Sequence, residues 1–277
     1  MKKVKLILDS SANEQSDESE NIQVVPLTLF VNGKEFLDDD KLNIDDFIKN
    51  MESSKQAGKT ACPSIQEWLD ALEGSDEVII ITVTSGMSGS FSSALQAKTM
   101  YEDKHPGSHI IVVDSRSAGP EMSIVLHEIE RLLKTKIRFV DLDQKIAEYR
   151  MHTHLLVILQ SLHNLALNGR VNPAIAKLAK LLKIDMVGTA SQEGKLEPLI
   201  KVHGMRRALR EVLKRMGAMK YNGKEVIIDQ CQNEKDAKIL KGEIVAKYPK
   251  AKVTIRPSHG LCAFYAEVGS LMVGFAD

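Results

Sequence analysis

The first half of this chain alternates short apolar segments with amphipathic ones, and this alternation restricts the possible folds more than any other feature. Apolar segments of strand length occur at residues 4–8, 78–83 and 109–115. Segments with the apolar spacing of a helix lie between and after them, at residues 65–74, from about residue 92, and at residues 121–134. Strands that alternate with helices are typical of a parallel sheet with crossover helices. We therefore expect an α/β fold whose N-terminal part is a mostly parallel sheet flanked by helices.

Short motifs predict where several of these elements begin and turn. Ser64 and Glu67 match the S-x-x-E capping box, so a helix is expected to begin after Ser64. Asn32-Gly33 interrupts an extended stretch and predicts a tight turn between two strands. The turn Glu193-Gly194 predicts a second hairpin, with strands at residues 181–189 and 195–202.

The second half of the chain has the pattern of an α+β region. An amphipathic helix is expected over about residues 205–219, followed by further strands and a helix. We place the boundary between two lobes near residue 160, with an N-terminal α/β lobe at residues 1–160 and a C-terminal α+β lobe at residues 161–277. The cleft between two such lobes is the default ligand site.

Composition and charge narrow the class of protein. Lys plus Arg and Asp plus Glu each number 37, so the formal net charge is zero, which argues against a nucleic-acid partner. The apolar run Val78–Ile81 is far too short to cross a bilayer, and residues 1–11 lack the core of a signal peptide. Three scattered cysteines fit reduced thiols better than disulfides or a zinc site. We expect a cytoplasmic protein with no transmembrane segment and no metal.

Residues 83–98, VTSGMSGSFSSALQAK, which we call the Ser/Gly segment, follow the expected strand 78–83 and lead into a helix. In a parallel sheet, the C-terminal ends of the strands open onto the ligand crevice. The first turn of a helix has unpaired N–H groups and the positive end of the helix dipole. Gly86 and Gly89 allow close approach of the backbone, and the serines add hydroxyl donors. The segment therefore predicts a site for an anion, although each serine taken singly could equally be a helix cap.

The motifs of several enzyme classes are absent from the sequence. Gly86-Met87-Ser88-Gly89-Ser90 lacks the final glycine of a nucleophile elbow, G-x-S-x-G. Neither a P-loop nor the dinucleotide motif G-x-G-x-x-G occurs. The anion could thus be a bound carboxylate, a phosphate or a reacting oxyanion. These alternatives correspond to a carrier and to an acyl or phosphoryl transferase or hydrolase, and an interaction module with an empty cleft is a third reading.

Five segments together carry a resemblance to a known family. In chain order they are LDSSAN (8–13), KTACPS (59–64), TSGMSGSFSSA (84–94), VVDSRSAG (112–119) and LHNLALNGRV (162–171). This ordered series resembles the DegV family of bacterial fatty-acid-binding proteins, whose segments read roughly DSSxD, TSxPS, SSxxSGTYxSA, VDSxSxS and LxxLxxGGRI. The resemblance extends weakly to residues 194–209 and 266–275, and so covers nearly the whole chain.

The resemblance implies two α/β lobes with a long-chain fatty acid between them, its carboxylate on hydroxyl groups. In this chain the threonine and serine that would bind the carboxylate are Thr60 and Ser93, and Ser88 and Gly89 belong to the same motif as Ser93. No cofactor and no catalytic residue are implied, so we expect a lipid carrier rather than an enzyme. The resemblance also implies a fatty-acid kinase as partner, to which the carrier presents the bound carboxylate.

The sequence departs from the family pattern at the expected polar rim. His203 stands where an arginine is usual, and Glu267 where the family has the histidine of HTGPG. A glutamate beside a carboxylate would repel it, which argues against the kinase partner. Arg170 is a candidate cation at the rim, and Cys62 a small residue lining the tunnel. The run Asp38-Asp39-Asp40 is expected to be a solvated turn.

Overall fold

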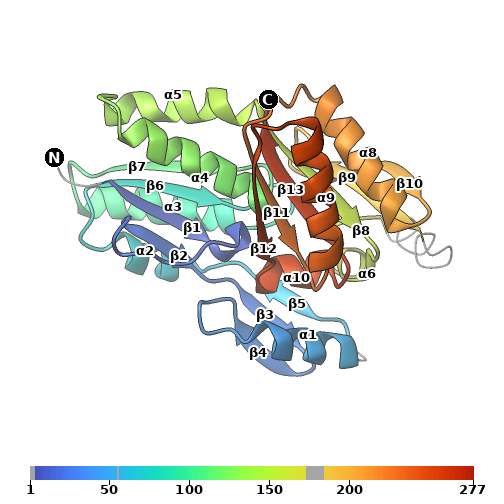
Figure 1. Ribbon diagram of the computed structural model, residues 1–277. Coiled ribbons are helices and arrows are strands. Elements are labelled where there is room, and N and C mark those ends of the chain that lie inside the picture. The colour runs from blue at the N-terminus through green and yellow to red at the C-terminus, as the bar shows by residue number, and fades with distance from the viewer. Residues whose placement is uncertain (1–3, 55, 173–183) are drawn as a thin grey trace.

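The computed structural model describes residues 4–54, 56–172 and 184–277, and these residues form three β-sheets with helices packed on them (Figure 1). The first sheet contains β1 (Lys5–Asp9), β2 (Ile22–Val25), β6 (Glu77–Thr82) and β7 (His109–Asp114), in the order β2-β1-β6-β7. All of its strand pairs are parallel, as the alternation of strands and helices predicts.

Helices cover both faces of this parallel sheet. Ile7 and Ile80 pack against α2 (Ile65–Leu72) and α3 (Ser90–Lys104), whereas Leu6 and Ile79 pack against α4 (Pro120–Leu133) and α5 (Phe139–Arg150). Apolar side chains on both faces explain why the strand segments are apolar throughout. The capping box that begins α2 forms as predicted, between Ser64 and Glu67.

The second sheet has six strands in the order β10-β9-β8-β13-β11-β12. Their bounds are β8 (Thr153–Leu159), β9 (Asp185–Ala190), β10 (Leu196–Val202), β11 (Glu225–Gln230), β12 (Lys252–Pro257) and β13 (Leu271–Ala276). Strands β9 and β10 form the predicted hairpin, although residues 181–183 of the expected first strand lie outside the described residues. Strand β8 pairs with β13 and β9, so the chain passes to the second sheet before residue 153, ahead of the expected lobe boundary near residue 160.

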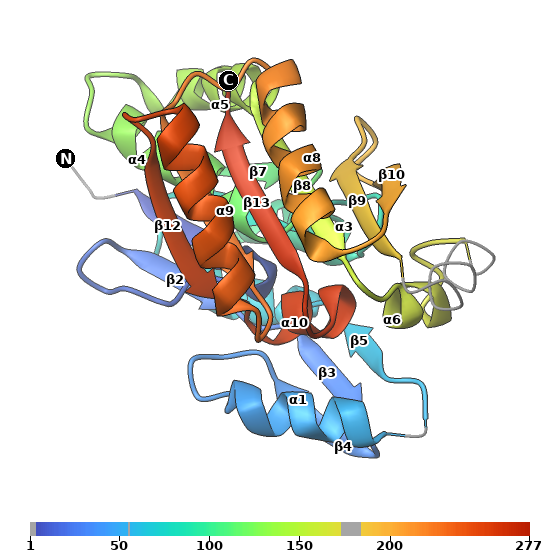
Figure 2. The same cartoon turned by 45° about the vertical axis from the view of Figure 1, so that its right-hand side comes forward.

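Two helices cover the outer face of the second sheet, α8 (Met205–Ala218) and α9 (Glu234–Lys247), as Figure 2 shows. Its inner face packs on α4, which also packs on the parallel sheet. A Cβ at Gly274 of β13 would collide with the backbone of Pro120 and Glu121, so only glycine allows this approach. Helix α4 therefore lies between the two sheets.

A small third sheet contains β3 (Thr28–Val31), β4 (Lys34–Leu37) and β5 (Lys59–Ala61), and α1 (Ile44–Ser53) packs on it. The turn between β3 and β4 is the predicted one, with positive φ angles of 54° at Asn32 and 74° at Gly33. Strand β2, which directly precedes Pro26, belongs instead to the parallel sheet. The small sheet contacts α10 (Gly260–Ala266) through an apolar cluster that includes Leu29 and Phe264.

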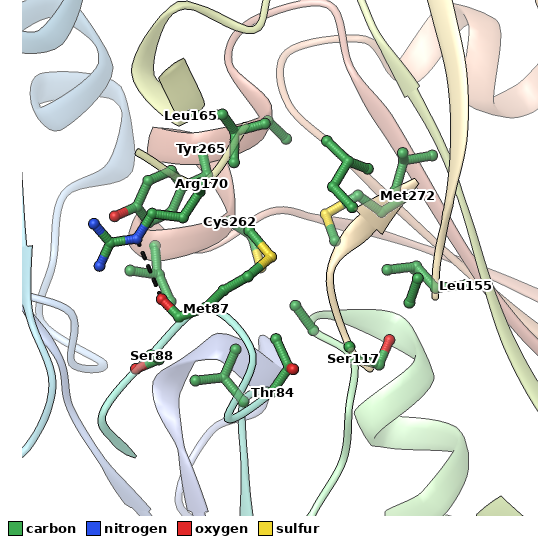
Figure 3. A pocket seen from close by; sticks show the side chains of 18 of the residues that line it. Thr84, Met87, Ser88, Ser117, Leu155, Leu165, Arg170, Cys262, Tyr265 and Met272 are labelled. Atoms are coloured by element: carbon green, nitrogen blue, oxygen red, sulfur yellow. Dashed lines mark hydrogen bonds between the residues drawn. The ribbon is translucent and has the colours of Figure 1, made fainter. Parts of the chain in front are cut away.

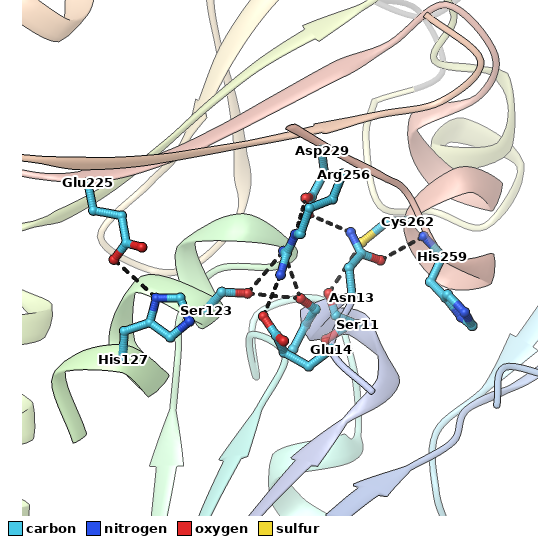
Figure 4. Close-up of polar contacts among 11 residues, drawn as sticks. Ser11, Asn13, Glu14, Ser123, His127, Glu225, Asp229, Arg256, His259 and Cys262 are labelled. Atoms are coloured by element: carbon cyan, nitrogen blue, oxygen red, sulfur yellow. Dashed lines mark hydrogen bonds and ion pairs between the residues drawn. The ribbon is translucent and has the colours of Figure 1, made fainter. Parts of the chain in front are cut away.

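A buried polar cluster joins the two large sheets (Figure 4). Arg256 of β12 donates to Asp229 of β11, with Nε at 2.8 Å from Oδ1 and Nη2 at 3.1 Å from Oδ2. The same guanidinium bonds Glu14 and the hydroxyl of Ser123, which belong to the side of the parallel sheet. Asn13 donates to Asp229 at 2.6 Å. Burial lowers the pKa of Arg256, but Asp229 and Glu14 outweigh it and raise that pKa above its ordinary value.

The acidic run at residues 38–40 is not simply a solvated turn, as the sequence suggested, because Asp38 is buried. Its carboxylate accepts hydrogen bonds from the N–H groups of Gly260 and Leu261 at 2.8 and 2.9 Å, and so caps the start of α10. It also bonds Ser10 Oγ and His259 Nδ1, both at 2.8 Å. One carboxylate thus connects the small sheet, the start of the chain and α10.

We expect Asp38→Ala to destabilise the protein, because it leaves two N–H groups and a histidine without their buried acceptor. The free energy of unfolding should fall by about 3 kcal/mol, as when one partner is removed from a buried charged network. Urea denaturation followed by circular dichroism measures this change. Asp40→Ala, at an exposed position of the same run, is the matched control and should stay within about 0.5 kcal/mol of the wild type. Equal losses in both variants would show that Asp38 is not the cap.

Candidate functional site

A pocket lies between the two large sheets, with about 860 Å³ of space free of protein atoms, part of it open to solvent (Figure 3). The C-terminal ends of β6 and β7 form one wall, and β8, the β9–β10 hairpin, α10 and β13 form the other. Most of the lining is apolar, including Leu155, Val157, Leu159, Cys262 and Met272. An apolar wall of this kind suits an aliphatic ligand.

Asp9 determines the shape of the Ser/Gly segment beside this pocket. Its buried Oδ2 accepts from Val83 N–H at 2.8 Å, at the end of β6, and from Ser90 Oγ at 2.6 Å, at the start of α3. Its Oδ1 accepts from the N–H and the hydroxyl of Ser11. One carboxylate therefore fixes both ends of the turn 83–90. Burial raises the pKa of Asp9, and these hydrogen bonds oppose that rise.

The Ser/Gly segment is also in direct contact with the tip of the β9–β10 hairpin. A Cβ at Gly86 would collide with the carbonyl oxygen of Glu193, and a Cβ at Gly194 would collide with Thr84. Arg116 Nη1 donates to Gln192 O at 3.2 Å beside this contact. The hairpin thus closes one side of the pocket against the parallel sheet.

Four residues form what we call the polar end of the pocket: Thr60, Ser88, Arg170 and Tyr265. Thr60 Oγ1 lies 2.8 Å from the hydroxyl of Tyr265. Ser88 Oγ accepts from Ser90 N–H at 3.2 Å, and none of the described residues accepts its proton. The guanidinium of Arg170 lies beside the Tyr265 ring and donates to the carbonyls of Met87, at 3.2 Å, and Asn168 (Figure 3).

Two other hydroxyls in the pocket wall donate to groups of the protein itself. Ser117 donates to Glu121 at 2.5 Å, and Thr189 donates to the carbonyl of Leu155 at 2.7 Å. Cys262 Sγ lies 3.3 Å from the carbonyl of Ser11, and burial raises the pKa of this thiol well above its usual value, so it stays protonated. An anion fits best at the polar end, where hydroxyls and the Arg170 guanidinium lie together.

Arg170 has no acidic partner among the described residues, since both of its hydrogen bonds go to backbone carbonyls. Its charge is thus uncompensated in the part of the chain that the structure describes. Together with the hydroxyls of Thr60 and Ser88, it gives the polar end the chemistry of a carboxylate site. Within the same described residues there is no group of three or more His, Cys, Asp or Glu side chains that could hold a metal ion.

The structure brings the segments 59–64 and 88–93 together, as their grouping in the sequence suggested, but it gives Ser93 other partners. Ser93 Oγ donates toward the carbonyls of Pro63 and Ser90, at 2.8 and 3.0 Å, and accepts from Trp68 Nε1 at 3.0 Å. Gly89 lies beside Cys62. Neither Ser93, Gly89 nor Cys62 is among the residues that line the pocket, whereas Thr60, Ser88 and Arg170 are.

Glu267 does not face the polar end. Its carboxylate accepts from Asn164 N–H at 3.1 Å and lines a separate hollow on the other side of α10. Tyr265, two residues earlier, faces the pocket in its place. Repulsion between Glu267 and an anion in the pocket, which the sequence led us to expect, does not follow from this arrangement.

Sequence reasoning missed two residues of the site, Tyr265 and Asp9. Tyr265 lies in the apolar run LCAFYA, where nothing in the local pattern separates it from a core residue. Asp9 ends a predicted strand in the segment LDSSAN, and that position at the carboxyl edge of a parallel sheet was the signal that could have identified it.

Comparisons with known proteins bear on the family and the fold of this chain. The model of the DegV family of uncharacterised proteins matches residues 3–277. A DegV domain-containing protein of Streptococcus pyogenes serotype M1 is 37% identical over 276 residues, which cover 98% of each chain.

Two solved structures also match over nearly their whole length. A DegV family protein from Eubacterium eligens loaded with heptadecanoic acid is 34% identical, with a TM-score of 0.95 over 99% of both chains. The Streptococcus pneumoniae Fatty Acid Kinase (Fak) B3 protein loaded with linoleic acid is 35% identical, with a TM-score of 0.95 over 98% of both chains. These matches confirm the predicted fold.

We expect Asp9→Asn to loosen the Ser/Gly segment, because each oxygen of Asp9 accepts a backbone N–H and an amide NH2 cannot accept. One N–H group, of Val83 or Ser11, would then face another donor. Stability should fall by about 1–3 kcal/mol, and exchange of the Val83 amide hydrogen should accelerate accordingly. Chemical denaturation and hydrogen exchange by NMR measure the two effects.

Asp114→Asn provides the matched control on the same turn. Asp114 Oδ1 accepts from the N–H groups of Ser85 and Arg116, but Oδ2 bonds only the hydroxyl of Ser85, which can rotate to accept from an amide. This variant should lose less than about 0.5 kcal/mol. An equal effect of the two substitutions would contradict the role given to Asp9.

Proposed function

The chain belongs to the DegV family, and on that premise we propose that it binds a long-chain fatty acid between its two lobes, as a carrier rather than an enzyme. The observation that carries the proposal is the form of the pocket, a mostly apolar cavity with the Thr60–Tyr265 hydroxyl pair and the Arg170 guanidinium at one end. The relatives loaded with heptadecanoic and linoleic acid support it.

The energetics of such a complex are favourable without a strong ion pair. Burial of about 15 methylene groups at about 0.8 kcal/mol each gives roughly 12 kcal/mol before the cost of association. Ordering and lost translational freedom cancel a large share of this gain. The remainder is enough for tight binding, and the polar end then fixes the direction in which the chain lies.

At the polar end, Thr60 and Ser88 would donate to the carboxylate, with Arg170 supplying positive charge nearby. Ser93 stays a predicted ligand of the carboxylate, which it could reach only by giving up a bond to a backbone carbonyl. The serine hydroxyls have no histidine or carboxylate base bonded to them at the polar end, within the described part of the chain. This arrangement favours a binding site over a nucleophile.

We also propose that the bound carboxylate is presented to a fatty-acid kinase. The relative described as a Fatty Acid Kinase B3 protein supports this partner, and Glu267, which faces away from the pocket, does not oppose it.

Within the described residues, no helix has the length and apolar character needed to span a membrane. The cytoplasm stays the predicted location.

The proposal predicts that the freshly purified protein carries a fatty acid that native mass spectrometry detects and that organic solvent extracts intact. Thr60→Val keeps the shape of the side chain and removes the hydroxyl, so affinity for added fatty acid should fall about tenfold to a hundredfold. Isothermal titration calorimetry on delipidated protein measures this. Thr99→Val, on the exposed side of α3, is the control and should bind like the wild type.

Two results would contradict the proposal. One is a wild-type protein that carries no lipid and binds none. The other is an acyl group that resists extraction and maps to Ser88 or Ser93 after digestion, which would indicate a covalent acyl enzyme.

A further inference from the structure

The phenol of Tyr265 lies at the polar end of the pocket, and three features of the structure fix its position. Its ring packs edge-on against Phe264, with centroids 4.9 Å apart and an interplanar angle of 83°. The Arg170 guanidinium lies 6.0 Å from the centroid of the ring. Asp38 caps the helix that carries the residue. The hydroxyl therefore has a defined position before any ligand binds.

This hydroxyl and that of Thr60 form a pair, 2.8 Å apart, in which either can be the donor. Each hydroxyl has a single proton, so the pair uses one proton internally and has a second to offer. A carboxylate is an acceptor only, with room for several hydrogen bonds on its two oxygens. When it arrives, both hydroxyls can turn their protons toward it, and O–H···O⁻ bonds are short and strong.

Arg170 adds to this preference for an anion. Its guanidinium is anchored by the carbonyls of Met87 and Asn168 and pairs with no carboxylate of the described residues. A cation held over the ring fixes the ring plane and favours negative charge next to the phenol. A neutral head group would gain little from this arrangement.

We propose that Tyr265 is a further ligand of the head group, which donates with Thr60 to the carboxylate and selects free fatty acids over neutral lipids of the same chain length. This inference rests on the proposed function, since it assigns a residue of the same site. In the alternative, which we call the latch, the Tyr265 hydroxyl bonds Thr60 only in the empty pocket. It moves away when the ligand enters and does not bind the ligand itself.

The test is Tyr265→Phe, which keeps the ring and its contacts with Phe264 and Arg170 and removes only the hydroxyl. Calorimetry on delipidated protein would compare tetradecanoic acid with tetradecan-1-ol. We expect affinity for the acid to fall about tenfold to a hundredfold, since the hydroxyl bonds a charged group, while affinity for the alcohol changes less than about threefold. Tyr221→Phe, which removes a hydroxyl bonded to the carbonyl of Lys224 outside the pocket, is the matched control and should change neither.

A second measurement separates a direct ligand from a merely structural role. With [1-¹³C]tetradecanoic acid bound, the carboxyl carbon signal is followed against pH by NMR. Loss of a hydrogen-bond donor to the carboxylate raises its apparent pKa, so Tyr265→Phe should shift the titration to higher pH and Tyr221→Phe should not.

The outcomes distinguish this inference from the function on which it rests. A wild-type protein that binds no tetradecanoic acid or any longer acid overturns both. A wild-type protein that binds, with an unchanged or raised acid affinity in Tyr265→Phe, overturns the role of Tyr265 alone, and raised affinity would identify the latch.

Discussion

The pocket depends first on one partly buried cation, Arg256, which bonds groups on both sides of the junction between the two large sheets. A guanidinium with little exposure must find partners for its charge and its N–H groups, and it finds them on both sides of the junction, in Asp229, Glu14 and Ser123. Loss of the fully buried Asp229 would leave Arg256 with Glu14 alone for its charge, and loss of Arg256 would leave the Asp229 carboxylate buried without its cation. The two sheets are therefore held in a fixed relative position, which fixes the width of the pocket between them. A site for an apolar ligand needs that rigidity, because its walls contribute to affinity only through close van der Waals contact.

Helix α4 is the second constraint on this junction. Its first half, residues 120–126, is buried on every side between the two layers, and Gly274 lets the second sheet approach its first turn. Its buried polar groups are matched within the fold, with Glu121 bonded to Ser117 and Thr153. The helix fills the part of the interface next to the pocket. The cavity thus begins where α4 no longer covers the inner face of the second sheet, next to the C-terminal ends of β6 and β7.

The features that the sequence predicted correctly are those encoded over short distances. Alternating strand and helix segments predicted the parallel sheet, Ser64 and Glu67 the start of a helix, and Asn32-Gly33 a hairpin, because each pattern acts between neighbours in the chain. Asp38 and Tyr265 were missed because their partners lie about two hundred residues away, and no local pattern marks such a pair. The lobe boundary was expected near residue 160, after β8, although β8 pairs with β9 and β13, because strand partners so distant in sequence leave no local pattern. The segments with the family motifs contribute residues to the pocket, but the motifs did not indicate which side chains of each segment face it.

The contact of Gly86 with the β9–β10 hairpin has a consequence for how this protein can change through evolution. Residues 86 and 194 lie in loops that connect to different sheets, and neither position has room for even one methyl group. A longer Ser/Gly segment or a longer hairpin could be accommodated only if the other retreated. The two loops are therefore expected to vary together among relatives. A change in the shape of the pocket would then require paired substitutions, because a single substitution in either loop would clash with the other.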